Sequence, residues 1–370
     1  MLRSLKIENF RCFPSFELNK LGRINLLVGK NNSGKTSILE AIQMLYSENN
    51  LETLGDTMKN RGEYLLDEGK NEYDIRHLFY GHEINLDSEF SIEGINLENN
   101  NRLKFSLSLI EDSDLIEDSN LESFDIVPRL MIKWLPKEKG EINFPLSING
   151  GLNVDYFRRQ RLQRTLRGTN KTDKPTQFVR SSSLDKETMK NLFDQIVLTP
   201  DEDLVIQALK SIEPDIERIA SINPRLRGSF VVQKTNNSDQ RIPLASMINF
   251  QRIPIGSMGD GISRILGLTL AIINAKNGVL LVDEIDTGLH FSAMSDMWKL
   301  LYETAKRLNV QVFATTHSRD CWESLAEIAE AKDSSENDIT IHRIEKGRAS
   351  SIVIGEDEMA IAAERGIEVR

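Results

Sequence analysis

Apolar and polar side chains alternate along the first part of the chain. The alternation over residues 2–10 predicts a β-strand, and residues 16–18 continue the pattern in a second strand. Residues 24–28 form a continuous apolar run, which predicts a third, buried strand. The spacing then becomes helical over about 35–45, where apolar residues recur one turn apart at Ile38, Leu39, Ile42 and Leu45.

The middle of the chain mixes the two patterns. Alternation returns over 84–110, and the stretches 129–135 and 143–148 are also strand-like, so antiparallel strands are expected here. Helical spacing predicts two helices through 185–197 and 200–212.

Two charged runs interrupt this region. Residues 111–125 carry seven acidic and no basic residues, which predicts a solvated loop. Residues 158–174 carry seven basic residues and one acidic residue. One interpretation of this basic run is a solvated loop, or a surface that meets an acidic partner. The other is a patch that contacts the phosphates of DNA or RNA.

The last third of the chain alternates helix and buried strand, a pattern typical of an α/β core. Composition adds little to this picture: 370 residues with 46 basic and 56 acidic side chains give a net charge of −10, ordinary for a soluble globular protein. No apolar run is long enough for a transmembrane helix, and the start of the chain lacks the apolar core of a signal peptide. We therefore expect a cytoplasmic protein with no membrane association. Two cysteines, Cys12 and Cys321, cannot build a disulfide scaffold or a metal cluster.

A phosphate-binding loop follows the third predicted strand. The eight residues match G-x-x-x-x-G-K-[ST] in full and lie between a buried strand and an amphipathic helix. The glycines let the backbone wrap an anion, the lysine reaches the β- and γ-phosphates of a nucleotide, and the threonine hydroxyl binds Mg²⁺. The predicted nucleotide-binding residues here are Gly29, Lys30, Asn31, Asn32, Ser33, Gly34, Lys35, Thr36 and the adjacent Ser37.

Two carboxylates end a second buried strand. Residues 278–282 are apolar except for the leading glycine, and Asp283 and Glu284 follow directly. The carboxyl end of a parallel strand is where α/β sheets bind ligands. Asp283 is therefore predicted to bind Mg²⁺, and Glu284 to orient or deprotonate an attacking water.

Two further features accompany these elements. A glycine-rich turn over 256–261 precedes a helical pattern; Ser257 and Gly259 there either cap that helix or bind the nucleotide of a second subunit. His317 follows the predicted strand 310–315 and either senses a γ-phosphate or makes a structural hydrogen bond.

The order of these motifs resembles that of an ABC-type ATPase head. Asn9-Phe10-Arg11 before the phosphate loop is similar to the RecF/SMC-like branch. The strings Leu281–His290 and Thr315–Ser318 resemble the ATPase part of the OLD family, which includes stand-alone relatives from antiphage defence systems.

This resemblance implies a set of roles. Lys35, Glu284 and His317 would be the catalytic residues, with His317 as the switch histidine. Thr36 and Asp283 would bind Mg²⁺. The remaining nucleotide contacts would come from the trans signature at Ser257 and Gly259, from Asp286 at the dimer seam, and from Arg11 near the nucleotide.

The resemblance also implies a domain plan. Residues 1–110 and 225–345 would form a composite α/β head, with an antiparallel lobe and a parallel core sheet. Residues 111–224 would be an inserted, partly helical arm, and 346–370 a C-terminal tail. The signature reads Ser-Met-Gly-Asp-Gly, unlike that of transporters, and too few residues follow His317 for the nuclease domain of OLD nucleases.

Two functional hypotheses remain open at this point. In the first, an ATPase that dimerises head to tail around ATP and Mg²⁺ controls a separately encoded effector, a nuclease or toxin, in antiphage defence. In the second, a RecF/SMC-like ATPase acts directly on DNA, and the 158–174 run is its nucleic-acid contact.

Overall fold

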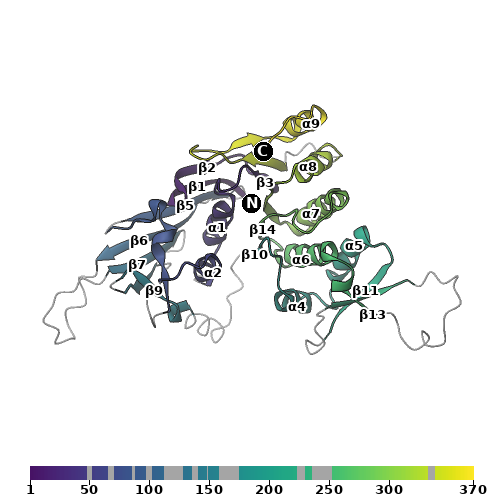
Figure 1. Ribbon diagram of the computed structural model, residues 1–370, viewed down its shortest axis with the longest axis horizontal. Coiled ribbons are helices and arrows are strands. Elements are labelled where there is room, and N and C mark those ends of the chain that lie inside the picture. Colours follow the sequence, from purple (N-terminus) through teal and green to yellow (C-terminus); the bar gives the residue numbers. More distant parts are fainter. Residues whose placement is uncertain are drawn as a thin grey trace. The chain divides into compact units, whose positions relative to one another are not determined.

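The computed structural model divides the chain into two compact units, drawn in Figure 1. The first unit comprises residues 1–22, 29–174 and 342–353, and the second comprises 23–28, 175–341 and 354–370. The residues that the structure describes are 1–47, 52–65, 71–85, 88–96, 102–111, 128–135, 141–147, 149–157, 175–222, 230–235, 252–331 and 338–370.

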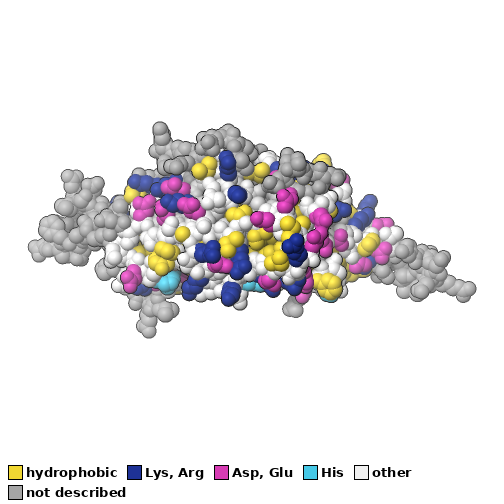
Figure 2. Space-filling model, turned by 90° about the horizontal axis from the view of Figure 1, so that it is seen from above, with side chains coloured by type: hydrophobic (Ala, Val, Ile, Leu, Met, Phe, Trp, Pro, Cys, Tyr) yellow, Lys and Arg dark blue, Asp and Glu magenta, His cyan; other side chains and the backbone are white. Residues whose placement is uncertain are grey.

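Charged side chains of both signs share the described surface. On the face shown in Figure 2, basic and acidic side chains lie interspersed, with apolar side chains between them. Among the helices of the described ranges, none is both long enough and apolar enough to cross a lipid bilayer.

An antiparallel six-stranded sheet forms the main part of the first unit. Its alternating residues put Leu5 opposite Leu18 and Ile7 opposite Phe16, all of them buried, as the sequence pattern predicts. In spatial order its strands are β2 (Phe13–Leu18), β1 (Leu2–Phe10), β5 (Glu89–Asn96), β6 (Arg102–Glu111), β7 (Pro128–Leu135) and β8 (Glu141–Pro145).

The described part of the first unit also contains helices and several short elements. The helix predicted from about Lys35 is confirmed and packs on β5 and β6 through its apolar face. The elements are α1 (Lys35–Leu45), α2 (Glu52–Arg61), the pair β4 (Glu72–Asp74) and β9 (Gly151–Asn153), and the 3-10 turns η1 (Ile75–Leu78) and η2 (Tyr80–His82).

A second six-stranded sheet forms the centre of the second unit, and its first four strands are parallel. Every residue of β3, β14 and β15 is buried, as expected for parallel strands covered on both faces. In spatial order the strands are β10 (Thr176–Val179), β14 (Val279–Val282), β15 (Gln311–Thr315), β3 (Ile24–Val28), β16 (Ile339–Arg343) and β17 (Ile352–Ile354).

Helices cover this parallel sheet in a row in which α6 packs on α7, α7 on α8 and α8 on α9 (Figure 1). The helices are α4 (Lys186–Asp194), α5 (Glu202–Ile212), α6 (Asp260–Asn274), α7 (Met294–Leu308), α8 (Arg319–Ala331) and α9 (Glu356–Glu364). The described residues of this unit also include a small antiparallel sheet and short 3-10 turns: β11 (Ile216–Ser221), β12 (Phe230–Lys234), β13 (Arg252–Pro254), η5 (Ile255–Ser257) and η6 (Phe291–Ala293).

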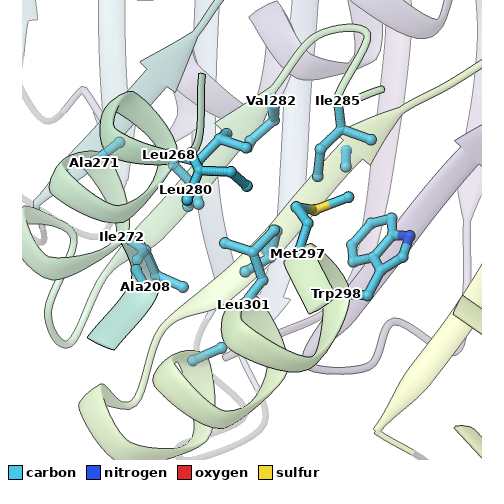
Figure 3. Packing of buried hydrophobic residues seen from close by; sticks show 14 of the residues in the cluster. Ala208, Leu268, Ala271, Ile272, Leu280, Val282, Ile285, Met297, Trp298 and Leu301 are labelled. Carbon is cyan, nitrogen blue, oxygen red and sulfur yellow. The ribbon is translucent and has the colours of Figure 1, made fainter. Parts of the chain in front are cut away.

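The core of the second unit lies between these helices and the parallel sheet. Figure 3 shows Leu268 of α6 beside Leu280 and Val282 of β14, with Met297 and Trp298 of α7 in the same cluster. All five side chains are at most 1% exposed. This packing fixes the carboxyl end of β14, which carries the predicted carboxylates, on a rigid support. The predicted α/β class, with an antiparallel sheet and a parallel core sheet, is confirmed.

The boundaries of the two units differ from the domain boundaries that the sequence led us to expect. Strands β7 and β8 lie within the expected 111–224 insert but belong to the sheet of β1, because they continue its hydrogen-bonded ladder. Strand β10 and helix α5 also lie in that range. β10 is the outermost strand of the parallel sheet, paired with β14, and α5 packs on α6. The expected tail 346–370 contains β17 and α9. The basic run 158–174 lies outside the described residues, as does the acidic run beyond Glu111.

Candidate nucleotide-binding site

The predicted phosphate loop joins β3 to α1. Gly29 and Gly34 both have positive φ, 143° and 99°. The Nζ of Lys35 donates hydrogen bonds to the carbonyl oxygens of Gly29 and Lys30, both at 2.9 Å, so the lysine folds back over its own loop. No side chain caps α1, and its first turn contains no acidic residue. The loop and the helix N-terminus therefore present a positive, backbone-lined cradle.

Gly34 needs to be glycine for reasons of space as well as conformation. A Cβ atom there would lie 2.3 Å from Cζ of Phe13 and 2.7 Å from Sγ of Cys12. The hydroxyl of Ser33 in the same loop is buried and has no hydrogen-bond partner among the residues that the structure describes. A buried orphan hydroxyl in a cationic cradle fits a bound anion with acceptor oxygens, such as the phosphates of a nucleotide.

The remaining loop residues differ in their surroundings. Lys30, Asn31 and Asn32 are exposed, Thr36 is half-buried, and Ser37 is buried. The Ser37 hydroxyl lies 3.4 Å from Nη2 of Arg61 on α2, on the side of α1 that faces that helix.

Arg11, which the resemblance places near a nucleotide, lies in a buried ion cluster. Its Nε is 3.4 Å from the carboxylate of Glu40 on α1, and its Nη1 donates to Glu63 and, at 2.8 Å, to the carbonyl of His77. Glu40 also pairs with Arg61 at 2.7 Å. Arg11 thus ties the turn after β1 to the helix that carries Lys35 and Thr36. Its contact with a nucleotide stays a prediction.

The second unit carries the predicted carboxylates at the end of β14. Oδ1 of Asp283 accepts a hydrogen bond from the Thr315 hydroxyl at 2.6 Å, and the same hydroxyl accepts one from the Glu284 amide at 2.8 Å. Glu284 has a φ of +48°, a left-handed conformation that costs a residue with a side chain about 1–2 kcal/mol. Thr315 offsets this cost and fixes both acidic residues relative to β15.

The loop after the carboxylates is held in the same way. The Thr316 hydroxyl donates to Oδ1 of Asp286 at 2.6 Å and accepts from the Ser318 amide at 2.9 Å. The carbonyl of His317, between them, accepts a hydrogen bond from the Arg370 guanidinium. Sequence reasoning missed the roles of the two threonine hydroxyls. The sequence feature that could have indicated these roles is the position of both threonines at the end of the buried strand β15, which pairs with β14.

The glycine-rich turn before α6 is open. Ser257 and Gly259 are exposed, and a Cβ at Gly259 would meet nothing within 4 Å. The N-cap of α6 is Gly259, with no side-chain cap, so Ser257 is not the capping residue that one interpretation proposed. Like that of α1, the N-terminus of α6 therefore has no side chain bound to its first amides.

Strand register brings several of these positions to one edge of the second unit. Val282, Ala314 and Leu26 are neighbours across the parallel sheet, and the Thr316 amide donates to the Leu27 carbonyl at 3.2 Å. The phosphate loop begins two residues after Leu27. Lys35 and Thr36 belong to the first unit, whereas Asp283 and Glu284 belong to the second. Among the described residues, no three His, Cys, Asp or Glu side chains are grouped so as to hold a metal ion by themselves.

Residues 24–320 match the protein family described as "AAA domain, putative AbiEii toxin, Type IV TA system". The match spans most of the chain, and the chain belongs to this family. The predicted enzyme class, an ATPase, is thereby confirmed, together with nucleotide binding as its general property.

Two curated relatives match nearly the full length of the chain. An "ATP/GTP phosphatase" of Helicobacter pylori is 24% identical over 352 residues, which cover 90% of each chain. The DNA replication and repair protein RecF of Streptococcus gordonii is 25% identical over 366 residues, which cover 85% of this chain and 93% of the relative.

The solved structures that resemble the chain include two SMC heads. The SMC head domain from Thermotoga maritima is 13% identical, with a TM-score of 0.46, over 96% of this chain and 98% of that one. An SMC head bound to the C-terminal winged-helix domain of ScpA is 12% identical, with a TM-score of 0.48, over 96% and 99%.

Proposed function

We propose that the chain is a Mg²⁺-dependent ATPase of the ABC type, with its phosphate loop at residues 29–36 and its Mg²⁺-binding and water-orienting carboxylates at Asp283 and Glu284. The observation that carries the proposal is the anion cradle at residues 29–36. It combines two positive-φ glycines, a lysine folded over the loop, an orphan hydroxyl at Ser33 and an uncapped helix N-terminus.

The residues present fit Mg²⁺ as well as the nucleotide. Magnesium in phosphoryl-transfer sites is held by one or two protein oxygens together with substrate phosphates, so a dedicated cluster of acidic residues is not needed. The Thr36 hydroxyl and the Asp283 carboxylate would hold it. When bound, the ion neutralises charge that develops on the phosphate oxygens. Glu284 would orient the attacking water and accept its proton, and Lys35 would stabilise the β- and γ-phosphates.

Dimerisation is the second part of the proposal. The open turn at Ser257 and Gly259 presents another uncapped helix N-terminus, suited to the γ-phosphate of ATP on a second copy of the chain. Asp286 would lie at the seam of such a head-to-tail dimer, and His317 would respond to the γ-phosphate. ATP would then bias an open–closed equilibrium, because only the closed dimer supplies both sets of contacts.

We propose further that this equilibrium controls a separately encoded effector in antiphage defence, with the chain as a stand-alone member of the OLD-like group. The family description, which names a toxin of a toxin–antitoxin system, supports this role. The RecF relatives support the alternative, an ATPase that acts directly on DNA. The chain's net charge of −10 and the interspersed charges in Figure 2 favour a protein partner over a nucleic acid on that face.

A thiol-labelling experiment tests nucleotide binding at the loop. Cys12 is exposed and adjoins Gly34, whereas Cys321 is buried, and burial raises the pKa of its thiol to about 12. Iodoacetamide should therefore label Cys12 selectively, and Mg-ATP should slow the labelling. Lys35→Ala should remove this protection, and Cys12→Ser should remove the label. Equal labelling rates of the unchanged protein with and without Mg-ATP would overturn the assignment of the cradle.

A mass measurement tests the role. Glu284→Gln should trap ATP and the closed dimer, so this variant is purified together with the products of the neighbouring genes, with and without ATP and duplex DNA. A stoichiometric second protein is the expected result. A lone oligomer that tightens on DNA in the presence of ATP would support the alternative instead. Glu330→Gln, a change of an exposed acid on α8, is the matched control and should behave as the unchanged protein does.

A further inference from the structure

One buried arginine lies directly behind the carboxylates in the second unit. Arg264 belongs to α6, one turn after the helix begins, and is 3% exposed. Its Nη2 donates to the carbonyl oxygens of Glu284 at 2.9 Å and Asp283 at 3.2 Å, and its Nη1 donates to that of Arg180 at 2.8 Å. The two carboxylate-bearing residues are therefore held through their backbone by a side chain of α6.

This contact fixes Glu284 from a second side. The Glu284 amide is held by the Thr315 hydroxyl of β15 at 2.8 Å, and its carbonyl is held by Arg264. Glu284 is in the left-handed region, with a φ of +48°. A residue in this conformation keeps it only while its surroundings determine it, so the direction of its side chain depends on both partners.

Arg264 makes no ion pair with a carboxylate within 4 Å among the described residues; its hydrogen bonds go to backbone carbonyls. A buried guanidinium stays protonated, and it is costly to bury unless its donors are satisfied. Burial lowers the pKa of the Arg264 guanidinium, and the negative charges of Asp286, Asp283 and Glu284 offset part of this effect. The planar Arg264 guanidinium bridges three backbone carbonyls and therefore fixes the positions of these backbone segments relative to one another. An ion pair between side chains at the surface would not fix the backbone in this way.

The start of α6 is also in contact with the loop after the carboxylates. A Cβ at Gly261 would lie 3.4 Å from the carbonyl oxygen of Gly288. The turn immediately before the helix, at Ser257 and Gly259, is the one proposed to meet a second copy's ATP. If the N-terminal end of α6 moves, residues 283–288 must adjust for two reasons. Gly261 packs on Gly288, and Arg264 is hydrogen-bonded to Asp283 and Glu284.

We infer that Arg264 is a positioning residue that sets the backbone of Asp283 and Glu284 and transmits nucleotide contact at Ser257 to the carboxylates. The transmission rests on the proposed function, whereas the positioning rests on the hydrogen bonds alone. Through this connection, the contact made by a second subunit aligns the water-orienting carboxylate of the first. Hydrolysis is thereby restricted to the closed dimer.

The conservative variant Arg264→Lys tests the positioning. Lysine keeps the charge but loses the planar fork, so it cannot hold the three carbonyls together. We expect faster hydrogen exchange at the amides of residues 283–287 and unchanged ATP protection of Cys12, in a protein that still unfolds in one cooperative urea transition, at a lower midpoint because buried hydrogen bonds are lost. We also expect kcat to fall about 10- to 100-fold, the scale of a misplaced catalytic group. Arg307→Lys on the exposed side of α7 is the matched control and should change none of these.

A folded Arg264→Lys protein with exchange and turnover like those of the unchanged chain would overturn the inference. If Arg264→Lys fails to fold, the exposed Ser257→Ala variant decides instead. Mg-ATP should slow exchange at 283–287 in the unchanged protein, and Ser257→Ala should abolish this slowing while Cys12 protection persists. Equal slowing in both proteins would show that no signal passes through α6.

The two proposals fail in distinguishable ways. If the unchanged protein shows neither turnover nor ATP protection of Cys12, the proposed function is wrong, yet the exchange rates of Arg264→Lys still decide the positioning role. If turnover is normal and Glu284→Gln abolishes it, the proposed function stands. Combining Arg264→Lys with Ser257→Ala should then lower kcat no further than the more severe single change. Multiplying effects would contradict transmission through Arg264.

Discussion

The Thr315 hydroxyl joins Asp283, the predicted Mg²⁺ ligand, and Glu284, the predicted catalytic carboxylate, to the central strand β15, and removing it should disturb both. The side chain is 1% exposed, donates to Asp283 at 2.6 Å and accepts from the Glu284 amide at 2.8 Å. Thr315→Val replaces the hydroxyl with a methyl group of nearly the same size. The change therefore removes two hydrogen bonds without opening a cavity.

The magnitude follows from these two bonds. A hydrogen bond to a charged group contributes about 1.5–3 kcal/mol, and a buried amide left without a partner costs about 1–3 kcal/mol. Asp283 remains partly able to reach water, so the two effects together should lower the free energy of unfolding by about 3 kcal/mol. Thr315→Ser keeps the hydroxyl and should cost at most about 1.5 kcal/mol, for the lost methyl group.

Urea unfolding followed by tryptophan fluorescence measures the difference, because Trp298 and Trp322 are fully buried in the second unit. Turnover measured on the same preparations should fall in Thr315→Val and remain close to normal in Thr315→Ser. Should Thr315→Val unfold within about 1 kcal/mol of the unchanged protein and turn over ATP at the same rate, the bridging role argued for this hydroxyl would be refuted.

Three further predictions follow from single side chains. Gly34→Ala should abolish ATP turnover and lower the urea midpoint, since the added methyl would lie 2.3 Å from the Phe13 ring and φ is +99°; normal turnover would contradict the steric argument. Burial lowers the pKa of His342 to about 4, so the contribution of the neutral imidazole to stability is full above pH 6.5 and is lost as the pH falls towards 4. In His342→Gln, the unfolding midpoint should therefore depend less on pH between 6.5 and 4. An identical pH dependence in both proteins would contradict this role of His342. The Arg370 guanidinium lowers the pKa of Glu368 to about 2, so this pair stabilises the protein above pH 4.5 and ceases to do so as the pH falls through 2; the difference in melting temperature between Glu368→Gln and the unchanged chain should vanish over that range.

The sequence was sufficient where local periodicity carries the information. The helix at 35–45 and the buried strands at 24–28 and 279–282 were predictable, because a 3.6-residue or a continuous apolar pattern persists over the whole element. The phosphate loop was predictable because its residue types and spacing are specific.

Long-range pairing was not predictable in this way. Strands β7 and β8 join the sheet of β1, although nothing in their own alternation distinguishes that sheet from an inserted arm. The pairing of Arg11 with Glu40 and Glu63 depends on two turns that bring distant segments together. Arg264 was invisible as a positioning residue, because an arginine on an apolar helix has no pattern that reveals three backbone carbonyls behind it.

The position of β3 in the parallel sheet has a consequence for how the protein is made. This strand precedes the predicted phosphate loop, and both of its hydrogen-bonded neighbours, β15 and β16, come from beyond residue 310. On the ribosome, β3 can therefore pair only after residues 311–315 have been translated. A nascent or prematurely terminated chain cannot anchor its nucleotide loop on this sheet. Only chains that have been translated beyond residue 343 can therefore pair β3 with both of its neighbours.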